Sequence, residues 1–283
     1  MERKYFKFER DGFLLNCIII GNGKPVIVIG SSDYYANLFP KEIYHNYQFI
    51  FLDHRGFAKK NEPINPLEIS LSHILDDCHE IQKHLKTEEC IIIGHSGHGY
   101  MALEYAKKFK ENVKALHIIA TGPSFGVHML ESEKRFEKEA SEAQKNKHRE
   151  NQIRFAQDIQ KEPDRFFKHY CRSMDAKGFY DWNFDSKELW EGIHTNKIIF
   201  DHLFGSVFRD IQIEKSLLNI NCPILVCMGK YDFQAPPYFT WDPFLKQFPN
   251  IKLSVFEKSG HLPFWEEPKL WVDLWENWNK TII

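Results

Sequence analysis

Ser96 stands where a buried strand is expected to turn sharply into a helix. An apolar run over 90–93 leads into a Gly-His-Ser-Gly turn over 94–97, and a helix-forming run over 100–106 follows. A serine held at such a bend has its hydroxyl pushed out of the top of a sheet, at the positive end of a helix dipole. This position suits the nucleophile of an acyl transfer, and we predict that role for Ser96.

Asp232 and His261 are the acid and the base predicted to activate that serine. A serine hydroxyl is a poor nucleophile until a base takes its proton, and the base needs an orienting carboxylate. Asp232 follows an apolar run that ends at Met228, and His261 follows another that ends near Phe256. Because groups at the carboxyl ends of parallel strands converge on one crevice, we expect Ser96, Asp232 and His261 to share one site.

Alternating strand and helix patterns predict an α/β fold that would position these residues. Segments 4–9 and 13–20 are typical of a hairpin around an Asp-Gly turn, and 70–85 is an amphipathic helix pattern. Apolar runs predict further strands at 25–29, 47–52, 90–93, 113–120, 223–229 and 251–256, with a closing helix over 268–278. Such alternation implies βαβ units, and so a mostly parallel central sheet with helices on both faces.

The composition changes in the middle of the chain. Charged and amide residues dominate 131–162, which is typical of a long or broken surface helix, and aromatic-rich helical segments follow. The strand pattern returns only at 223. We therefore expect a helical cap over 123–217 to interrupt a core made of 1–122 and 218–283.

Four short motifs in this order resemble the α/β-hydrolase family along nearly the whole chain. They are Asp-His-Arg-Gly at 53–56, the Gly-His-Ser-Gly turn at 94–97, Gly-Lys-Tyr-Asp at 229–232 and Ser-Gly-His at 259–261. The resemblance implies an α/β-hydrolase fold with an inserted helical cap and a Ser-Asp-His triad. Dehalogenase and epoxide hydrolase chemistry is disfavoured, because those relatives carry an aspartate where this chain has Ser96.

The resemblance also implies an oxyanion hole made of two backbone N–H groups. One belongs to Gly97, directly after the predicted nucleophile. The other lies in the turn after the strand at 25–29, which by position is Ser31. Many relatives carry a His-Gly pair where this chain has Ile29-Gly30, but a backbone donor tolerates that change.

His98 is the clearest departure from the family pattern, which has a small residue there so that the helix can approach a strand. Gly99 and Ala102 are expected to supply the close contact instead, with a slightly displaced helix. Two residues along a helix correspond to about 200° of rotation. We therefore expect the His98 side chain to point away from Ser96, and His261 to remain the base.

Other polar residues are given structural interpretations. We expect His54 and His95 to be buried packing residues, and Asp53 and Arg55 to form a structural turn and an ion pair. The histidines of the 79–84 segment are about 140° apart around a helix, so they do not predict a zinc site. No motif requires a metal, a nucleotide or a flavin, and we predict no cofactor.

The cap carries the candidates for substrate binding, namely Trp190, Glu191 and Trp182. The chain resembles proline iminopeptidases in outline, and in those enzymes acidic cap residues bind the free amino group of the substrate. A Trp-Glu pair is part of that pattern. The chain lacks their Gly-rich oxyanion loop and their Trp after the serine, and Glu191 can equally be a solvated surface residue.

Composition excludes several other classes of protein. The 283 residues are 43% hydrophobic and 27% charged, with a formal net charge of −2. This balance predicts no nucleic-acid and no membrane partner. The six cysteines lack CxxC spacing and are expected to be buried, reduced thiols. With no apolar signal core or membrane span, a cytoplasmic location is expected.

The residues together predict a capped serine hydrolase that cleaves a small ester, amide or lactone through an acyl-enzyme on Ser96. The substrate would be a small molecule or a short peptide. Alternatives are a proline iminopeptidase-like aminopeptidase, a carbon–carbon bond hydrolase, an acyltransferase, or a non-catalytic ligand-binding receptor on the same fold. The natural substrate and the oligomeric state stay open.

Overall fold

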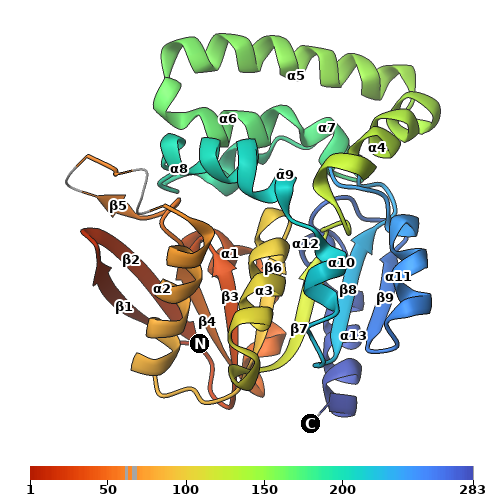
Figure 1. Cartoon of the computed structure of the whole chain (residues 1–283). Coiled ribbons are helices and arrows are strands. Elements are labelled where there is room, and N and C mark those ends of the chain that lie inside the picture. Colours follow the sequence, from red (N-terminus) through yellow and green to blue (C-terminus); the bar gives the residue numbers. More distant parts are fainter. Residues whose placement is uncertain (61–62, 66–68, 283) are drawn as a thin grey trace.

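A single mixed sheet forms the centre of the molecule (Figure 1), whose computed structural model describes residues 1–60, 63–65 and 69–282. The strands are β1 (Arg3–Arg10), β2 (Phe13–Ile20), β3 (Lys24–Gly30), β4 (Tyr47–Asp53), β5 (Lys59–Lys60), β6 (Cys90–His95), β7 (Val113–Ile119), β8 (Ile224–Gly229) and β9 (Ile251–Phe256). Their spatial order is β1-β2-β4-β3-β6-β7-β8-β9, and the short β5 pairs with β2.

The sheet is antiparallel at one edge and parallel through the rest. β1 and β2 form the predicted hairpin, in which Asp11 and Gly12 have φ angles of 51° and 75°, as the favoured two-residue turns allow. β2 is also antiparallel to β4, whereas every later neighbouring pair from β4 to β9 is parallel. The predicted α/β class with a mostly parallel sheet is confirmed.

Both faces of the sheet are buried, because its central strands are apolar on both sides. In β3, Val26 and Val28 belong to one core cluster and Ile27 and Ile29 to the other. The first cluster includes residues of α1 (Ser32–Leu38), η1 (Lys41–His45), α12 (Pro263–Glu266) and α13 (Pro268–Ile282). The second includes residues of α2 (Leu71–His84), α3 (Gly97–Lys108), α10 (Ile213–Leu217) and α11 (Asp242–Gln247).

Only helical elements are described between β7 and β8. They are α4 (Phe125–Glu139), α5 (Glu142–Lys161), η4 (Pro163–Arg165), α6 (Phe166–Ser173), α7 (Asp175–Gly178), η5 (Ser186–Trp190), α8 (Lys197–His202), the π-helical η6 (Leu203–Val207), α9 (Phe208–Asp210) and α10. Figure 1 shows α4 to α9 as a layer above the ends of β3, β6 and β8, while α10 lies beside α3. The predicted domain boundaries near 123 and 217 stay a prediction. Two 3₁₀ segments, η3 (Lys110–Asn112) and η7 (Tyr238–Trp241), lie outside this stretch of the chain.

Ser31 is the N-cap of α1, because its hydroxyl accepts a hydrogen bond from the Tyr34 amide at 3.3 Å. The helix ends at Leu38, and the apolar residues beyond it belong to η1. An N-cap acts through an acceptor placed three residues before the amide it satisfies, a requirement that Ser31 meets here.

Cysteine placement follows the prediction for four of the six thiols. In the described part of the chain Cys17, Cys78, Cys90 and Cys227 are buried and free, whereas Cys171 and Cys222 are half-buried and free. Among the same residues, no group of three or more His, Cys, Asp or Glu is arranged to hold a metal ion. No described helix is both long enough and apolar enough to cross a bilayer.

Candidate active site

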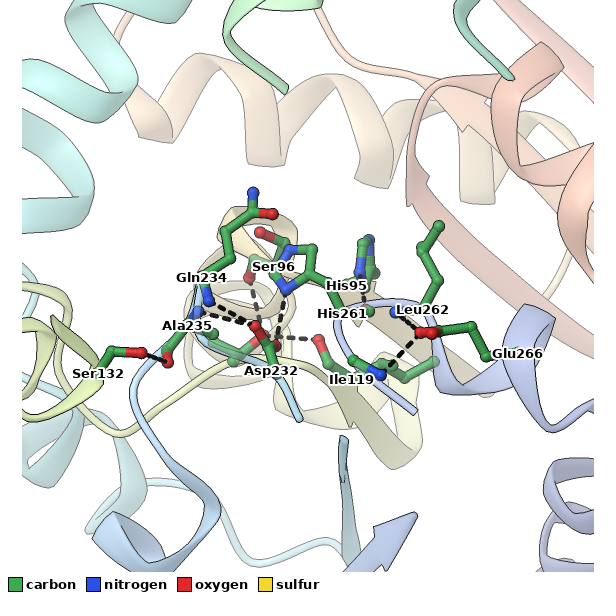
Figure 2. Close-up of polar contacts among 12 residues, drawn as sticks. His95, Ser96, Ile119, Ser132, Asp232, Gln234, Ala235, His261, Leu262 and Glu266 are labelled. Atoms are coloured by element: carbon green, nitrogen blue, oxygen red, sulfur yellow. Dashed lines mark hydrogen bonds and ion pairs between the residues drawn. The ribbon is translucent and has the colours of Figure 1, made fainter. Parts of the chain in front are cut away.

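Ser96 occupies a strained turn between β6 and α3. Its φ of 57° and ψ of −130° lie in a region that side-chain-bearing residues rarely adopt. Two hydrogen bonds hold this turn: the Ser96 amide donates to the carbonyl of Ile119 at 2.8 Å, and the Thr121 hydroxyl donates to the carbonyl of Ser96 at 2.7 Å. The strain is therefore supported by the end of the neighbouring strand β7 (Figure 2).

Two glycines allow α3 to approach the sheet closely enough to form this turn. A Cβ atom on Gly94 would lie 2.2 Å from the carbonyl oxygen of His98, and one on Gly99 would lie 2.1 Å from the Thr121 hydroxyl. Both distances are shorter than any real contact. Gly99 thus supplies the close contact that the sequence predicted, one position after the place where the family pattern has a small residue.

Asp232 and His261 are hydrogen-bonded to each other beside Ser96 (Figure 2). His261 Nδ1 lies 2.8 Å from Asp232 Oδ2, while Asp232 Oδ1 accepts the backbone amides of Gln234 and Ala235 at 2.8 and 3.0 Å. A carboxylate can only accept, so Nδ1 of the neutral ring carries the proton and donates it to Asp232. Nε2 is then the unprotonated nitrogen. Ser96 and His261 line the same pocket.

The backbone of the loop around His261 is hydrogen-bonded to three separate parts of the chain. The His261 amide donates to the Gly178 carbonyl at 2.5 Å, and the ring of His95 donates from Nε2 to the His261 carbonyl at 2.8 Å. Glu266 accepts the two amides that flank His261, at 2.8 and 3.2 Å. Burial raises the pKa of Glu266 to about 7. The role of Glu266 was not predicted from the sequence, because nothing in the local pattern separates Glu266 from the acidic residue that follows it.

The turn after β3, where one oxyanion donor is predicted, is hydrogen-bonded to the Asp53 carboxylate. Its Oδ1 accepts the Ser32 amide at 2.7 Å, and its Oδ2 accepts the side-chain amide of Asn16 at 2.8 Å. Burial raises the pKa of Asp53 to about 6. Gly97 lines the pocket, whereas Ser31 is buried and is not among the described lining residues. Their roles as oxyanion donors stay predictions.

Comparison with known proteins places this geometry in a family. The sequence model for the alpha/beta hydrolase fold matches residues 19–268. The AB hydrolase superfamily protein YclE of Bacillus subtilis (strain 168) is 36% identical over 269 residues, which cover 95% of this chain and 96% of that protein. The chain belongs to the α/β-hydrolase family.

Other relatives of this α/β hydrolase include proline iminopeptidases. The one from Heyndrickxia coagulans is 25% identical over 263 residues, covering 88% of each chain. A crystal structure of the proline iminopeptidase from Mycobacterium smegmatis superposes with a TM-score of 0.74 at 17% identity, covering 99% of this chain and 98% of that one. At this identity the structural likeness shows the fold alone. The predicted resemblance to α/β hydrolases, and distantly to proline iminopeptidases, is confirmed.

His98 of this α/β hydrolase lies beside the pocket. Its ring is buried, and the residue lines the same pocket as Ser96. The predicted rotation of about 200° assumed two helical steps, whereas Ser96 precedes α3 with non-helical dihedral angles, and the direction of the His98 side chain relative to Ser96 stays a prediction. Both ring nitrogens are engaged, Nδ1 with the Tyr35 hydroxyl at 2.9 Å and Nε2 with His54 at 3.0 Å.

Arg55 has a structural role, as predicted. Its guanidinium is fully buried and pairs with Asp77 at 2.5 and 2.8 Å and with Asp11 at 2.6 Å. These contacts join the turn after β4 to α2 and to the first hairpin. His54 and His95 are buried, also as predicted.

The three cap candidates occupy different environments in the hydrolase. Trp190 lines the pocket and stacks on Tyr34, with ring centroids 4.4 Å apart. Glu191 is exposed, Trp182 is half-buried, and neither is among the described residues that line the pocket. The turn after η5 directs the Glu191 side chain to the surface, so the structure brings only Trp190 to the site.

Asp175 is an acidic pocket residue that the sequence analysis missed. It is buried at the start of α7 and lines the same pocket as Ser96. Both of its carboxylate oxygens accept hydrogen bonds from Ser186, from the amide at 2.9 Å and from the hydroxyl at 2.7 Å. Among the described residues no cation lies within ion-pair distance of it. Burial raises the pKa of Asp175 to about 7.

Proposed function

We propose that this α/β hydrolase is a serine hydrolase that cleaves a small ester, amide or lactone through an acyl-enzyme on Ser96. The observation that carries the proposal is the His261–Asp232 pair, whose geometry leaves Nε2 free to take a proton in the pocket that Ser96 lines. A strained serine beside such a pair is the arrangement that nucleophilic acyl transfer needs.

Each residue of the proposed site has one task in the reaction. Ser96 attacks the substrate carbonyl while His261 Nε2 takes its proton, and Asp232 stabilises the imidazolium that forms. The backbone N–H groups of Gly97 and Ser31 would hold the oxyanion, and donors of this kind contribute about 3 kcal/mol each. His261 then protonates the leaving group, and the same base activates the water that releases the acyl group.

The pocket walls favour an apolar substrate group near the proposed nucleophile. Phe57, Phe167, Phe204 and Trp190 line the pocket together with Ser96. Aromatic rings offer large apolar contact area at a small cost in side-chain entropy. Carbon–carbon bond hydrolysis and acyl transfer to another acceptor would use the same groups and remain alternatives.

An aminopeptidase is the second candidate, and Asp175 is the observation that favours it. Among the described residues, Ser186 is the one side-chain or backbone donor to this buried carboxylate, which therefore has acceptor capacity for an ammonium group on the substrate. Several relatives carry the name proline iminopeptidase. Asp175 takes the place of Glu191 in this proposal, because the pocket contains the former and not the latter.

One experiment separates the proposed reactions. The purified protein and Ser96→Ala are treated with a fluorophosphonate probe, and turnover is measured for p-nitrophenyl esters of different chain length and for prolyl and alanyl arylamides. Labelling that is lost in Ser96→Ala supports the serine hydrolase, and preference for arylamides supports the aminopeptidase.

Two other outcomes would contradict or redirect the proposal. An unlabelled wild type, or labelling that persists in Ser96→Ala, would contradict the acyl-enzyme mechanism and favour a ligand-binding receptor. A labelled protein that turns over neither substrate class would indicate a different acyl acceptor or a carbon–carbon substrate.

A further inference from the structure

A chain of hydrogen bonds runs from the turn after β4 to the loop that carries His261. It begins at the Gly56 amide, which lies 2.9 Å from His54 Nδ1, and continues from His54 Nε2 to His98 Nε2 at 3.0 Å. All of these rings are buried. The histidine that departs from the family pattern is therefore the second ring of a connected series.

The chain continues through Tyr35 to the proposed base. The Tyr35 hydroxyl lies 2.9 Å from His98 Nδ1 and 3.0 Å from His95 Nδ1, and His95 Nε2 lies 2.8 Å from the His261 carbonyl oxygen. Tyr35 also reaches the turn after β3, because its amide donates to the Ser31 carbonyl at 3.1 Å. One residue thus contacts both the predicted oxyanion turn and the series that ends on His261.

The two ends of the chain determine the position of every proton in it. The Gly56 amide can only donate, so His54 Nδ1 accepts and its Nε2 carries the proton. The His261 carbonyl can only accept, so His95 Nε2 carries a proton and its Nδ1 accepts from Tyr35.

His98 must then complete the chain in one way. The Tyr35 oxygen accepts from His98 Nδ1, and His98 Nε2 accepts from His54. Each hydrogen bond contains one proton, and all three rings are neutral. Burial favours this state, since it lowers the pKa of His54 to about 3 and those of His95 and His98 well below the usual value.

We propose that Tyr35 and His98 are positioning residues, which fix the His261 loop and the Ser31 turn relative to Ser96 through this proton-ordered chain. The inference rests on the proposed serine hydrolase function. His98 acts through its two ring nitrogens, which a small residue would lack, and Tyr35 acts through one hydroxyl that donates and accepts. Loss of that hydroxyl breaks the chain at its centre and leaves two ring nitrogens unsatisfied.

The test compares Tyr35→Phe with Tyr44→Phe in the full-length protein. Tyr44 is a matched control, because its buried hydroxyl has no hydrogen-bond partner among the described residues. The rate of fluorophosphonate labelling of Ser96 should fall about tenfold or more in Tyr35→Phe and stay near wild type in Tyr44→Phe. For p-nitrophenyl esters, kcat should fall while KM stays within about twofold, as positioning and not substrate binding is lost.

Nitrogen-15 NMR of labelled histidines gives a second readout that is independent of turnover. His98 should show the Nδ1–H tautomer, whereas His54 and His95 should show the Nε2–H tautomer. In Tyr35→Phe the His98 signature should change, while Tyr44→Phe should leave all three unchanged. A His98 ring that carries its proton on Nε2 in the wild type would overturn the proposed chain.

The kinetic outcomes distinguish failure of this inference from failure of the proposed function. If wild type is labelled and Tyr35→Phe is labelled equally fast, the positioning role is wrong and the serine hydrolase proposal stands. If wild type is not labelled at all, the proposed function is wrong, and the positioning role falls with it whatever the tautomers are.

Discussion

Two sets of polar residues at the pocket, which we call its floor and its roof, differ in how fully their polar atoms are hydrogen-bonded. The floor is the set Tyr35, His95 and His98, which line the pocket, together with His54, which is hydrogen-bonded to His98, and the roof is the pair of cap residues Asp175 and Ser186. In the floor, every ring nitrogen and the tyrosine hydroxyl is hydrogen-bonded. In the roof, a buried carboxylate is satisfied by one serine, with no cation in ion-pair distance among the described residues.

This difference indicates a division of tasks. Each proton in the floor already has an acceptor, so the floor has nothing to offer a substrate and can act only on geometry. The roof retains acceptor capacity and lies on the inserted helices, where pocket shape can vary without disturbing the sheet. We therefore expect floor substitutions to affect the chemical step, and roof substitutions to affect the choice of substrate.

The largest expected effect belongs to the core side of the site, at Asp232→Asn. Asparagine keeps the oxygen that accepts the amides of Gln234 and Ala235, so the loop should fold normally. Its NH₂ group would face His261 Nδ1 and force the ring proton onto Nε2, where the ring can no longer accept from Ser96. We expect kcat for p-nitrophenyl esters to fall about 10⁴-fold.

A matched control for that change is Asp210→Asn, which alters an exposed aspartate beside Arg209. Its kcat should match wild type. Asp232→Asn that folds normally and retains more than about a tenth of the wild-type kcat would contradict the assignment of Asp232 as the orienting acid.

The core could be predicted from the sequence because its signals are local. Apolar runs predicted β3, β4 and β6 to β9, and the positions directly after them led to the proposal of Ser96, Asp232 and His261. The hydrogen-bond partners of His98 could not be predicted, because Tyr35 and His54 are distant from it in the sequence. The two-residue β5 is too short to produce a pattern.

Asp175→Asn tests the roof. A hydrogen bond to a charged group contributes about 1.5–3 kcal/mol, so kcat/KM for prolyl and alanyl arylamides should fall roughly 10- to 100-fold. Turnover of p-nitrophenyl esters should change little. Protection of Ser96 from the fluorophosphonate probe by the corresponding amino-acid amides measures the same effect without requiring turnover.

Glu191→Gln is the control for the roof, since Glu191 is an exposed acid of the same cap. It should change kcat/KM for the arylamides by less than about twofold. A larger effect of Glu191→Gln than of Asp175→Asn would reverse the assignment and restore Glu191, which the sequence offered as a candidate.

The roof was harder to predict than the core for a physical reason. Trp190 and Glu191 were predicted as a pair because they are adjacent in the sequence. In the structure, adjacent residues in η5 and the turn after it point in different directions. Asp175 precedes them by many residues and has an ordinary helical context. Only the packing of α7 against η5 brings its carboxylate to Ser186 and into the pocket.

The contributions of His54 in the floor and Asp175 in the roof to the free energy of unfolding should change with pH in opposite directions. The folded pKa of His54, about 3, is below its unfolded value of 6.5, so the unfolded chain binds the proton first and stability falls as pH drops below about 6.5. The folded pKa of Asp175, about 7, is above its unfolded value of 3.8, so its contribution falls as pH rises from about 4 to 7.

Two variants separate these contributions in urea unfolding measured between about pH 4.5 and 7.5. As pH falls, wild type should lose stability relative to His54→Gln and gain stability relative to Asp175→Asn, each by at most about 1.4 kcal/mol per pH unit. Differences that stay constant with pH in both variants would show that neither group titrates as its burial implies.

The smallest expected effect is the pH profile of substrate choice in the wild type. Asp175 becomes a carboxylate above about pH 7, whereas a substrate α-amino group loses its charge above about pH 8. The ratio of kcat/KM for arylamides to that for esters should peak between these values and fall about threefold one pH unit to either side. Taking the ratio removes titrations common to both substrates. The acidic side of this peak should disappear in Asp175→Asn; if it persists there, the group that selects the amine belongs to another part of the pocket.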